Sequence, residues 1–86
     1  MIDRNVTHSK KEPPGEIAAL GNPTTTWSPR SKADVIRDIE SGSYRYLVRW
    51  PEKETVVRVV NGATGKYLRS DRDETTRNNL LDLPNL

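Results

Sequence analysis

The sequence predicts a small α+β domain, in which an antiparallel β-sheet of three to five strands carries one helix on its aromatic face. Three observations lead to this fold class: two adjacent segments rich in β-branched and aromatic residues, a glycine-containing turn into a third such segment, and one amphipathic stretch upstream. The chain has 86 residues, enough for one domain near the lower size limit for folding without disulfides or metals. We expect residues 1–14 to be loosely ordered with an edge strand at most, residues 15–84 to form the domain, and residues 85–86 to be a tail.

The composition excludes several classes of protein. The net charge of +2 is too small for a disordered chain, although Leu, Ile, Val and Phe make up only about a fifth of the residues. No stretch approaches the roughly 18 apolar residues of a membrane helix, and the N-terminus lacks the apolar core of a signal peptide. The absence of Cys excludes disulfides, thiolate zinc sites and a Cys nucleophile. We therefore expect a cytoplasmic protein that does not bind membranes.

The first 26 residues leave two alternatives open. Residues 4–10 can form an edge strand, and the short apolar run at residues 17–20 can pair with it across the break at Pro13, Pro14 and Gly15. These residues form either an irregular hairpin or a partly disordered segment.

Residues 30–41 are predicted to form the helix. Ser28 before Pro29 offers one N-cap, and Ser31 with Asp34 three residues later offers another. Gly42 is placed to be the left-handed C-cap. Four apolar residues form one stripe at spacings of three and four: Ala33, Val35, Ile36 and Ile39. The charged residues of the segment are expected to face water: Arg30, Lys32, Arg37, Asp38 and Glu40. Trp27 should pack under the start of the helix.

Residues 44–50 and 55–60 are predicted to pair as antiparallel strands across a four-residue loop. In the register that we expect, Val48 lies opposite Val57. This register places the large residues on one face, which should form the core against the helix: Tyr44, Tyr46, Trp50, Val48, Val57 and Val59.

A glycine-containing loop at residues 61–65 should lead into a third strand at residues 66–70, with either Tyr67 or Leu68 facing inward. After a polar turn at residues 71–76, three leucines should fold back onto the sheet before Pro84: Leu80, Leu81 and Leu83.

Residues 66–84 carry the pattern KYLRSDxDxTTxNNLLxLP. By this pattern, and by the layout from Trp27 through the helix and the hairpin, the chain resembles a family of short, mostly bacterial proteins catalogued as a domain of unknown function. The family pattern has Thr at the position of Ser70 and Gly at that of Glu74. The resemblance covers residues 17–84 and implies a fold, but it brings no catalytic or binding residues.

The outer face of the predicted sheet is the candidate binding surface. It combines basic and apolar side chains: Arg45, Leu47, Arg49, Val56, Arg58 and Val60. Six basic and two acidic residues fall between positions 44 and 70, so the positive charge of the chain is concentrated on the sheet. Such a face can be a solvated surface whose Arg stems cover apolar neighbours, a protein interface, or a nucleic-acid-binding surface. The order of elements is similar to that of a double-stranded-RNA-binding domain, but the segment after residue 70 is acidic.

Other motifs favour structural roles. Asp71, Asp73, Thr75 and Asp82 have the spacing of calcium-loop ligands, but the Gly that such a loop needs is Thr76, and a turn capped by its own Asp side chains explains the pattern equally. His8, the single histidine, has no neighbour in sequence that would orient it as a base. We therefore expect no enzyme, no cofactor and no metal. The expected function is an interaction or accessory module of unknown partner, with weak nucleic-acid binding as the alternative.

Overall fold

The computed structural model describes residues 2–12, 16–63, 65–70 and 79–86, and these residues form eight strands, one α-helix and one 3-10 helix. The strands are β1 (Ile2–Asn5), β2 (His8–Glu12), β3 (Glu16–Gly21), β4 (Arg30–Ser31), β5 (Tyr44–Arg49), β6 (Glu54–Val56), β7 (Arg58–Gly62) and β8 (Gly65–Arg69). The helix α1 spans Lys32–Ser41, and the 3-10 helix η1 spans Asn79–Asp82. The predicted class, α+β with antiparallel sheets, is confirmed.

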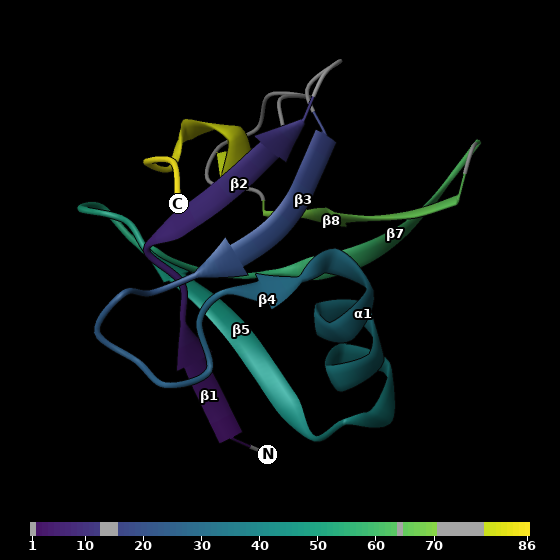
Figure 1. Cartoon of the computed structure of the whole chain (residues 1–86), viewed down its shortest axis with the longest axis horizontal. Coiled ribbons are helices and arrows are strands. Elements are labelled where there is room, and N and C mark those ends of the chain that lie inside the picture. Colours follow the sequence, from purple (N-terminus) through teal and green to yellow (C-terminus); the bar gives the residue numbers. More distant parts are fainter. Residues whose placement is uncertain (1, 13–15, 64, 71–78) are drawn as a thin grey trace.

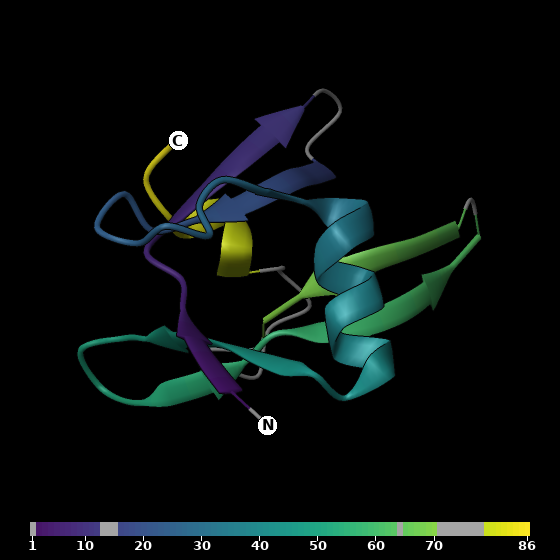
Figure 2. The ribbon, with the colours of Figure 1, turned by 60° about the horizontal axis from the view of Figure 1, so that its bottom comes forward.

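The strands form three small sheets rather than the single sheet that we expected. Their orders are β1-β5-β6, β2-β3-β4 and β7-β8. All described pairs are antiparallel except β1 with β5, which run parallel. Figure 1 shows the β2-β3 hairpin above β1 and β5, with the β7-β8 ribbon and α1 on the right. In the turned view of Figure 2, α1 lies between β3 and the two strands of the ribbon.

The N-terminal segment, which we expected to be loosely ordered, supplies β1 and β2. The edge strand predicted for residues 4–10 is present as two strands, each at the edge of its sheet, because the chain changes sheets in its middle. The N–H of Val6 donates to the carbonyl of Leu47 (2.7 Å), and the next N–H, of Thr7, donates to Gly21 in β3 (3.0 Å). Val6 itself is 1% exposed, so its side chain is buried at the point where the two sheets meet. The hairpin alternative is confirmed for β2 and β3, which pair antiparallel.

The outer edge of β2 is covered by the last residues of the chain. The N–H of Ser9 donates to the carbonyl of Pro84 (3.0 Å), and the N–H of Leu86 donates to the carbonyl of Ser9 (3.3 Å). The hydroxyl of Ser9, fully buried, also donates to the carbonyl of Leu80 (2.7 Å). These bonds hold the C-terminal segment, residues 83–86, against the second strand of the protein.

Helix α1 begins two residues later than predicted. Ser31 is its N-cap, with a side-chain oxygen that accepts from the N–H of Asp34 (3.2 Å), and Gly42 ends it with the predicted left-handed conformation (φ 75°). The alternative start at Ser28 is wrong, because the two residues before the helix pair with β3 as β4. The hydroxyl of Ser28 instead accepts from the N–H of Asn22 (2.9 Å). No helix in the described part of the chain has the length and apolarity of a membrane span.

The predicted apolar stripe of the helix needs two corrections. Val35 is buried, and Ile36 and Ile39 pack half-buried against the core, as expected. Ala33 is exposed, whereas Asp38, expected to face water, is only 6% exposed. The helical period explains both results: Asp38 lies three residues after Val35 and shares its face, and Ala33 lies two residues before Val35 and points away.

Strands β5 and β6 pair antiparallel as predicted, but their register differs by two residues. Val48 lies opposite Thr55 rather than opposite Val57. Because side chains alternate along a strand, a shift of two residues keeps each side chain on its predicted face. The strand predicted for residues 55–60 is interrupted at Val57, whose N–H still donates to Tyr46 in β5 (2.8 Å). Beyond that bond the chain leaves β5 and pairs with β8 instead.

The β7-β8 hairpin has a tighter turn than the loop predicted for residues 61–65. Gly62 pairs with Gly65, so only two residues lie between the strands. Gly65 has a positive φ of 129°, which only Gly adopts without strain. Leu68 is the inward residue, fully buried, and Tyr67 is half-buried on the other side.

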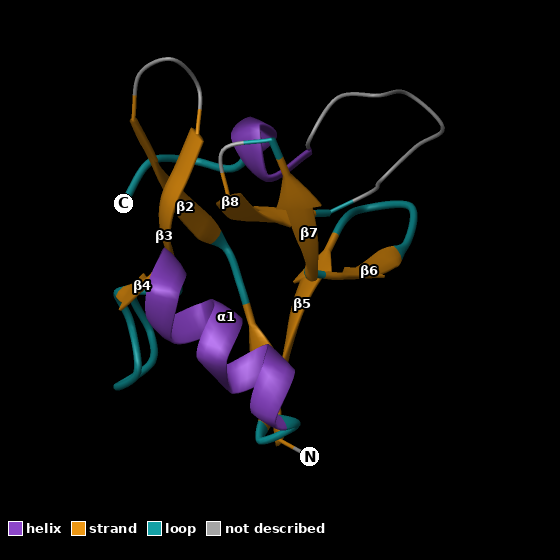
Figure 3. Ribbon diagram, turned by 90° about the vertical axis from the view of Figure 1, so that its right-hand side faces the viewer, coloured by secondary structure: helices purple, strands orange, loops and turns teal. Residues whose placement is uncertain are grey.

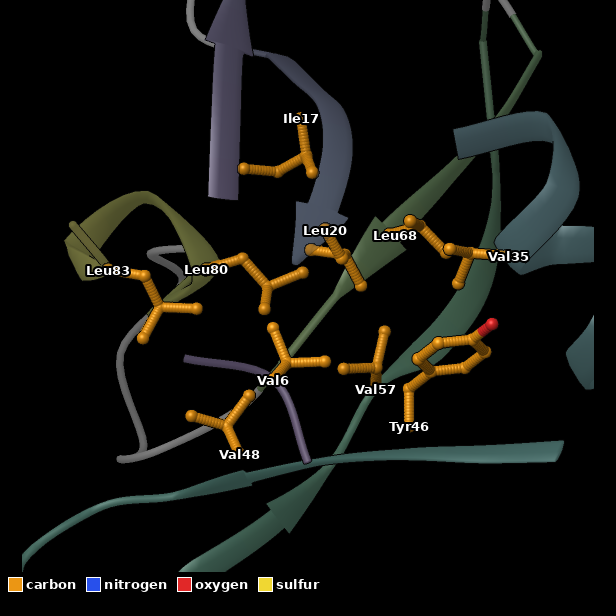
Figure 4. Close-up of a cluster of buried hydrophobic side chains, with 10 residues drawn as sticks. All are labelled: Val6, Ile17, Leu20, Val35, Tyr46, Val48, Val57, Leu68, Leu80 and Leu83. Atoms are coloured by element: carbon orange, nitrogen blue, oxygen red, sulfur yellow. The ribbon is translucent and has the colours of Figure 1, made fainter. Parts of the chain in front are cut away.

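Buried side chains from β3, α1, β5, β8 and η1, and from the residues that join elements, meet in one core (Figure 4). They are Val6, Ile17, Leu20, Val35, Tyr46, Val48, Val57, Leu68, Leu80 and Leu83. The predicted aromatic face of the sheet and the return of the leucines are both confirmed, because the remaining members of those sets pack half-buried against this core: Tyr44, Trp50, Val59 and Leu81. Figure 3 shows α1 below β3 and β8, with β5 to its side. The predicted turns at 13–15 and 71–76 lie outside the described residues.

Candidate functional site

The six residues of the predicted binding face are divided between two sheets. Four of them lie in the β1-β5-β6 sheet and two in the β7-β8 ribbon: Arg45, Leu47, Arg49 and Val56, and then Arg58 and Val60. Leu47 is 3% exposed and therefore cannot contact a partner, and Val60 is half-buried. Val56, 44% exposed, and Arg58 are open to solvent.

The basic residues of this face on β5 are paired with carboxylates. Arg45 donates from Nε and Nη2 to the two carboxylate oxygens of Asp3, both at 2.9 Å. The hydrogen bond from Arg45 lowers the pKa of Asp3 below its usual value. Arg49 donates from Nε to Glu54 Oε2 at 3.1 Å. Both arginines of the predicted binding face on β5 are thus neutralised by a neighbouring carboxylate.

A second group of charged residues is buried beneath α1, and the sequence analysis missed it. The carboxylate of Asp38 receives two hydrogen bonds from Arg30, from Nε to Oδ2 at 2.8 Å and from Nη2 to Oδ1 at 2.9 Å. The hydroxyl of Tyr46, which is fully buried, donates to Asp38 Oδ2 at 2.5 Å. Arg4 Nη1 in turn donates to the Tyr46 hydroxyl at 2.8 Å. We call these four residues the Asp38 cluster.

Aromatic rings enclose the Arg4 guanidinium. Its central carbon lies 3.5 Å from the centre of the Tyr44 ring, a short stacking contact, and 5.5 Å from that of the Trp27 ring. Trp27 meets the Tyr46 ring edge to face, with centroids 5.7 Å apart and an angle of 81°. The side chain of Arg4 is consequently only 14% exposed.

The ionisation of the Asp38 cluster follows from these contacts. The hydrogen bonds from Arg30 lower the pKa of Asp38, more than its burial raises it. Burial and the adjacent carboxylate raise the pKa of Tyr46, so its hydroxyl stays protonated and can donate. The same contact with Asp38 raises the pKa of Arg30. Each polar group is used by another member, so the cluster fastens α1 to β1, β4 and β5. One sequence signal pointed to it: Asp38 lies three residues after Val35, on the core stripe.

The predicted metal and histidine motifs do not form a site in the described part of the chain. There, no group of three or more His, Cys, Asp or Glu side chains could hold a metal ion. Asp71, Asp73 and Thr75 lie outside the described residues, and Asp82 accepts a hydrogen bond from Asn79 Nδ2 at 3.1 Å. His8 Nδ1 lies 2.7 Å from the hydroxyl oxygen of Thr7.

A cavity of about 140 Å³ opens on the surface between β3, the start of α1 and β8. Seven residues line it: Glu16, Ile17, Lys32, Gly65, Lys66, Tyr67 and Leu68. Ile17 and Leu68 lie beneath the cleft and are 4% and 0% exposed, so its open surface comes from the other residues that line it: Glu16, Lys32, Gly65, Lys66 and Tyr67. Three charged residues, each on a different element, line it: Glu16 of β3, Lys32 of α1 and Lys66 of β8. We call this site the β3-β8 cleft.

The two lysines of the β3-β8 cleft differ in their partners. Lys66 Nζ lies 2.6 Å from Glu40 Oε2 in an ion pair whose side chains are both 46% exposed. Lys32 makes no ion pair with any described residue. The sequence could not predict this cleft, because its walls come from residues 16–17, 32 and 65–68 and depend on β8 lying beside β3.

The chain belongs to a family of proteins of unknown function, DUF3892, whose family model matches residues 5–84. The resemblance stated from the sequence is thereby confirmed. Comparison with curated proteins and with solved structures gives no match.

Proposed function

We propose that this member of the DUF3892 family is a non-enzymatic interaction module that binds a protein partner at the β3-β8 cleft. The observation that carries the proposal is the cleft itself: a cavity between β3, α1 and β8 that is lined by the ring of Tyr67 and by charged residues. Its volume of about 140 Å³ is well below the roughly 300 Å³ at which sites for small molecules and cofactors begin. A cavity of this size fits a single side chain, which is how a protein partner anchors in a pocket.

The pairing of surface charges supports a protein partner over nucleic acid. Binding to phosphates needs lysines and arginines that are free to replace counterions. On the predicted binding face, Arg45 and Arg49 each have a carboxylate oxygen within 3.1 Å. Such exposed pairs contribute only about 0–1 kcal/mol to stability. Each pair that a phosphate displaces would nevertheless leave one carboxylate without its partner beside the phosphate.

The proposed cytoplasmic location rests on composition. A chain without Cys gains nothing from an oxidising compartment, where secreted domains of this size depend on disulfides.

A photo-crosslinking experiment tests the proposed function. p-Benzoylphenylalanine is incorporated at Tyr67, which lines the cleft, and in a matched variant at Lys53, which is exposed between β5 and β6. Irradiation in the producing cells should give a discrete protein adduct from position 67 only, and Lys32→Glu should abolish it. Circular dichroism melts establish that the variants are folded. Equal adducts from both positions, or an adduct that is indifferent to Lys32→Glu, would contradict the proposal.

The nucleic-acid alternative has its own test. Four phosphate contacts would give a log–log salt slope of about −3 to −4 on duplex. We expect no measurable binding of duplex DNA or RNA at 0.15 M salt in fluorescence anisotropy. Micromolar binding with that slope, lost in Arg58→Ala, would make nucleic acid the better assignment.

A further inference from the structure

We infer that the β3-β8 cleft takes an acidic, extended segment of the partner, which runs along β8 at Gly65 and Lys66 and places a carboxylate at Lys32. The inference rests on the proposed function and names the chemistry of its partner. Three features of the cleft lead to it: its strand walls, its charges and its size.

One wall of the cleft is β8, at the edge of its ribbon among the described residues, and the other is the part of β3 that β4 does not reach. β8 has one strand neighbour among the described residues, β7, and Gly65 and Lys66 lie at its exposed start. On the opposite wall, β4 pairs with β3 only at Ala19 and Leu20, beyond the cleft-lining residues of that strand. Figure 3 shows β8 beside β3, close to the first turn of α1. An extended chain can satisfy main-chain groups at such an edge by adding to it as a strand.

The charges of the cleft decide which extended chain is accepted. A lysine on an edge strand commonly prevents unrelated strands from adding to that edge. An apolar segment would bury the charge of the lysine, and a basic segment would be repelled by it. Lys66 and Lys32 together present two ammonium groups to the cleft, against the single carboxylate of Glu16. Lys66 can exchange Glu40 for a carboxylate of the partner at little cost, because the existing pair is 46% exposed on both sides. Lys32 has no described partner to give up.

The size of the cavity fixes how the segment is anchored. About 140 Å³ holds one side chain against the half-buried ring of Tyr67. In an extended segment alternate side chains lie on one face, so one residue fills the cavity while its neighbours two positions away reach the rim. A segment that alternates β-branched and acidic residues meets both requirements.

The test uses two synthetic peptides with the full chain. The acidic probe is acetyl-Thr-Glu-Val-Glu-Val-Glu-Thr-amide, and the control probe has Lys in place of each Glu. Binding is followed by backbone amide shifts in ¹⁵N–¹H spectra. We expect saturable shifts from the acidic probe at Ile17, Lys32 and Lys66, and none there from the basic probe.

Three substitutions make the test quantitative. Lys32→Glu should weaken the acidic probe by at least about five-fold, and Glu16→Gln should strengthen it by about two- to five-fold, the range for exposed charge pairs. Lys53→Glu, an equal change of charge away from the cleft, should alter binding by less than about two-fold at physiological salt, where distant charges are screened. Lys32→Glu places an acidic residue in the first turn of α1, which helices tolerate well, so loss of binding cannot be attributed to unfolding.

The outcomes separate the two proposals. Equal binding of both probes, shifts away from the cleft, or equal effects of Lys32→Glu and Lys53→Glu would overturn the inference. If the acidic probe fails while the position-67 crosslink persists, the partner is not an acidic extended segment, and the interaction module remains. If both fail, the proposed function fails with the inference.

Discussion

Replacing Asp38 by Asn isolates the contribution of the buried cluster to stability. The side chain keeps its size and one acceptor oxygen, but it loses its charge and turns an N–H₂ donor toward Arg30 or Tyr46. In the native protein the carboxylate receives two hydrogen bonds from Arg30 and one from Tyr46. The substitution thus turns the amide N–H₂ group of Asn toward an N–H group of Arg30, so that two donors face each other. It also leaves the guanidinium groups of Arg30 and Arg4 without the carboxylate that they pair with.

The expected loss is about 3 kcal/mol of unfolding free energy. Removing one partner of a buried ion pair costs about 3–5 kcal/mol. The lower end applies here, because the side chain of Arg30 remains 30% exposed and can recover hydration. A domain of this size has a total stability of roughly 4–13 kcal/mol. With a urea dependence of about 1 kcal/mol/M, the midpoint of unfolding should fall by about 2–3 M.

Asp34→Asn is the matched control on the same helix. Asp34 also pairs with an arginine, Arg37 at 2.9 Å, but their side chains are 36% and 73% exposed. Its replacement should cost less than about 1 kcal/mol. If urea melts show Asp38→Asn within about 0.5 kcal/mol of Asp34→Asn, the cluster does not stabilise the fold and our reasoning about it is wrong.

The same carboxylate gives a pH dependence. The pKa of Asp38 is lowered in the folded protein, whereas in the unfolded chain it is about 3.9. The stabilisation is therefore complete above the unfolded pKa and is lost as the pH falls through the lower, folded pKa. Between pH 5 and pH 2 the wild type should lose more stability than Asp38→Asn, so their melting temperatures should converge. Parallel pH profiles would show that another group is responsible.

Three further predictions concern the core, the C-terminal segment and metal binding. Trp50→Ala should cost about 2–4 kcal/mol in urea melts because its ring packs half-buried against the core, and Arg49→Ala, 70% exposed, should cost under about 1 kcal/mol; equal losses would contradict the facing of β5. Gly21→Ala should speed amide exchange at Leu86 and lower stability, because the new methyl would overlap Leu86 Cδ2 and lie 2.6 Å from Ser28 Oγ, and adding Leu86→Ala should restore only the part of the loss that is due to Leu86. Titration with calcium to millimolar should leave the amide of Asp82 unmoved, and a saturable shift there would revive the calcium-loop interpretation.

The elements that depend on local pattern could be predicted from the sequence. The helix is defined by the apolar stripe around Val35 and by Gly42 at its end. The alternation of apolar and polar side chains defines which face of β5 is buried. The register of β5 with β6 could not be predicted to the residue, because alternation fixes the face but allows shifts of two, and the length of the turn decides among them. The separation of the β7-β8 ribbon from the β1-β5-β6 sheet likewise depends on the interruption at Val57, which no local pattern predicts.

The features that depend on distant partners could not be predicted. A charged residue on the core stripe, such as Asp38, is normally assigned to solvent, since its burial is acceptable only with specific partners. The partners of Asp38 come from three different strands: Arg4 from β1, Arg30 from β4 and Tyr46 from β5. The β3-β8 cleft has the same origin, since its residues meet only after β8 packs beside β3.

The pairing of the first strands with late parts of the chain sets an order on folding during synthesis. β1 needs residues 44–47, and Ser9 in β2 receives its outer neighbours only from residues 84–86. At the usual rate of roughly 5–20 residues per second, the N-terminal strands leave the ribosome several seconds before those partners exist. In that interval their unsatisfied main chain could join any other extended polypeptide. The consecutive charges of Lys10, Lys11 and Glu12 on β2 keep it hydrated and discourage such encounters, so these residues serve the nascent chain before Lys11 donates to Leu83 and Asn85 in the finished fold.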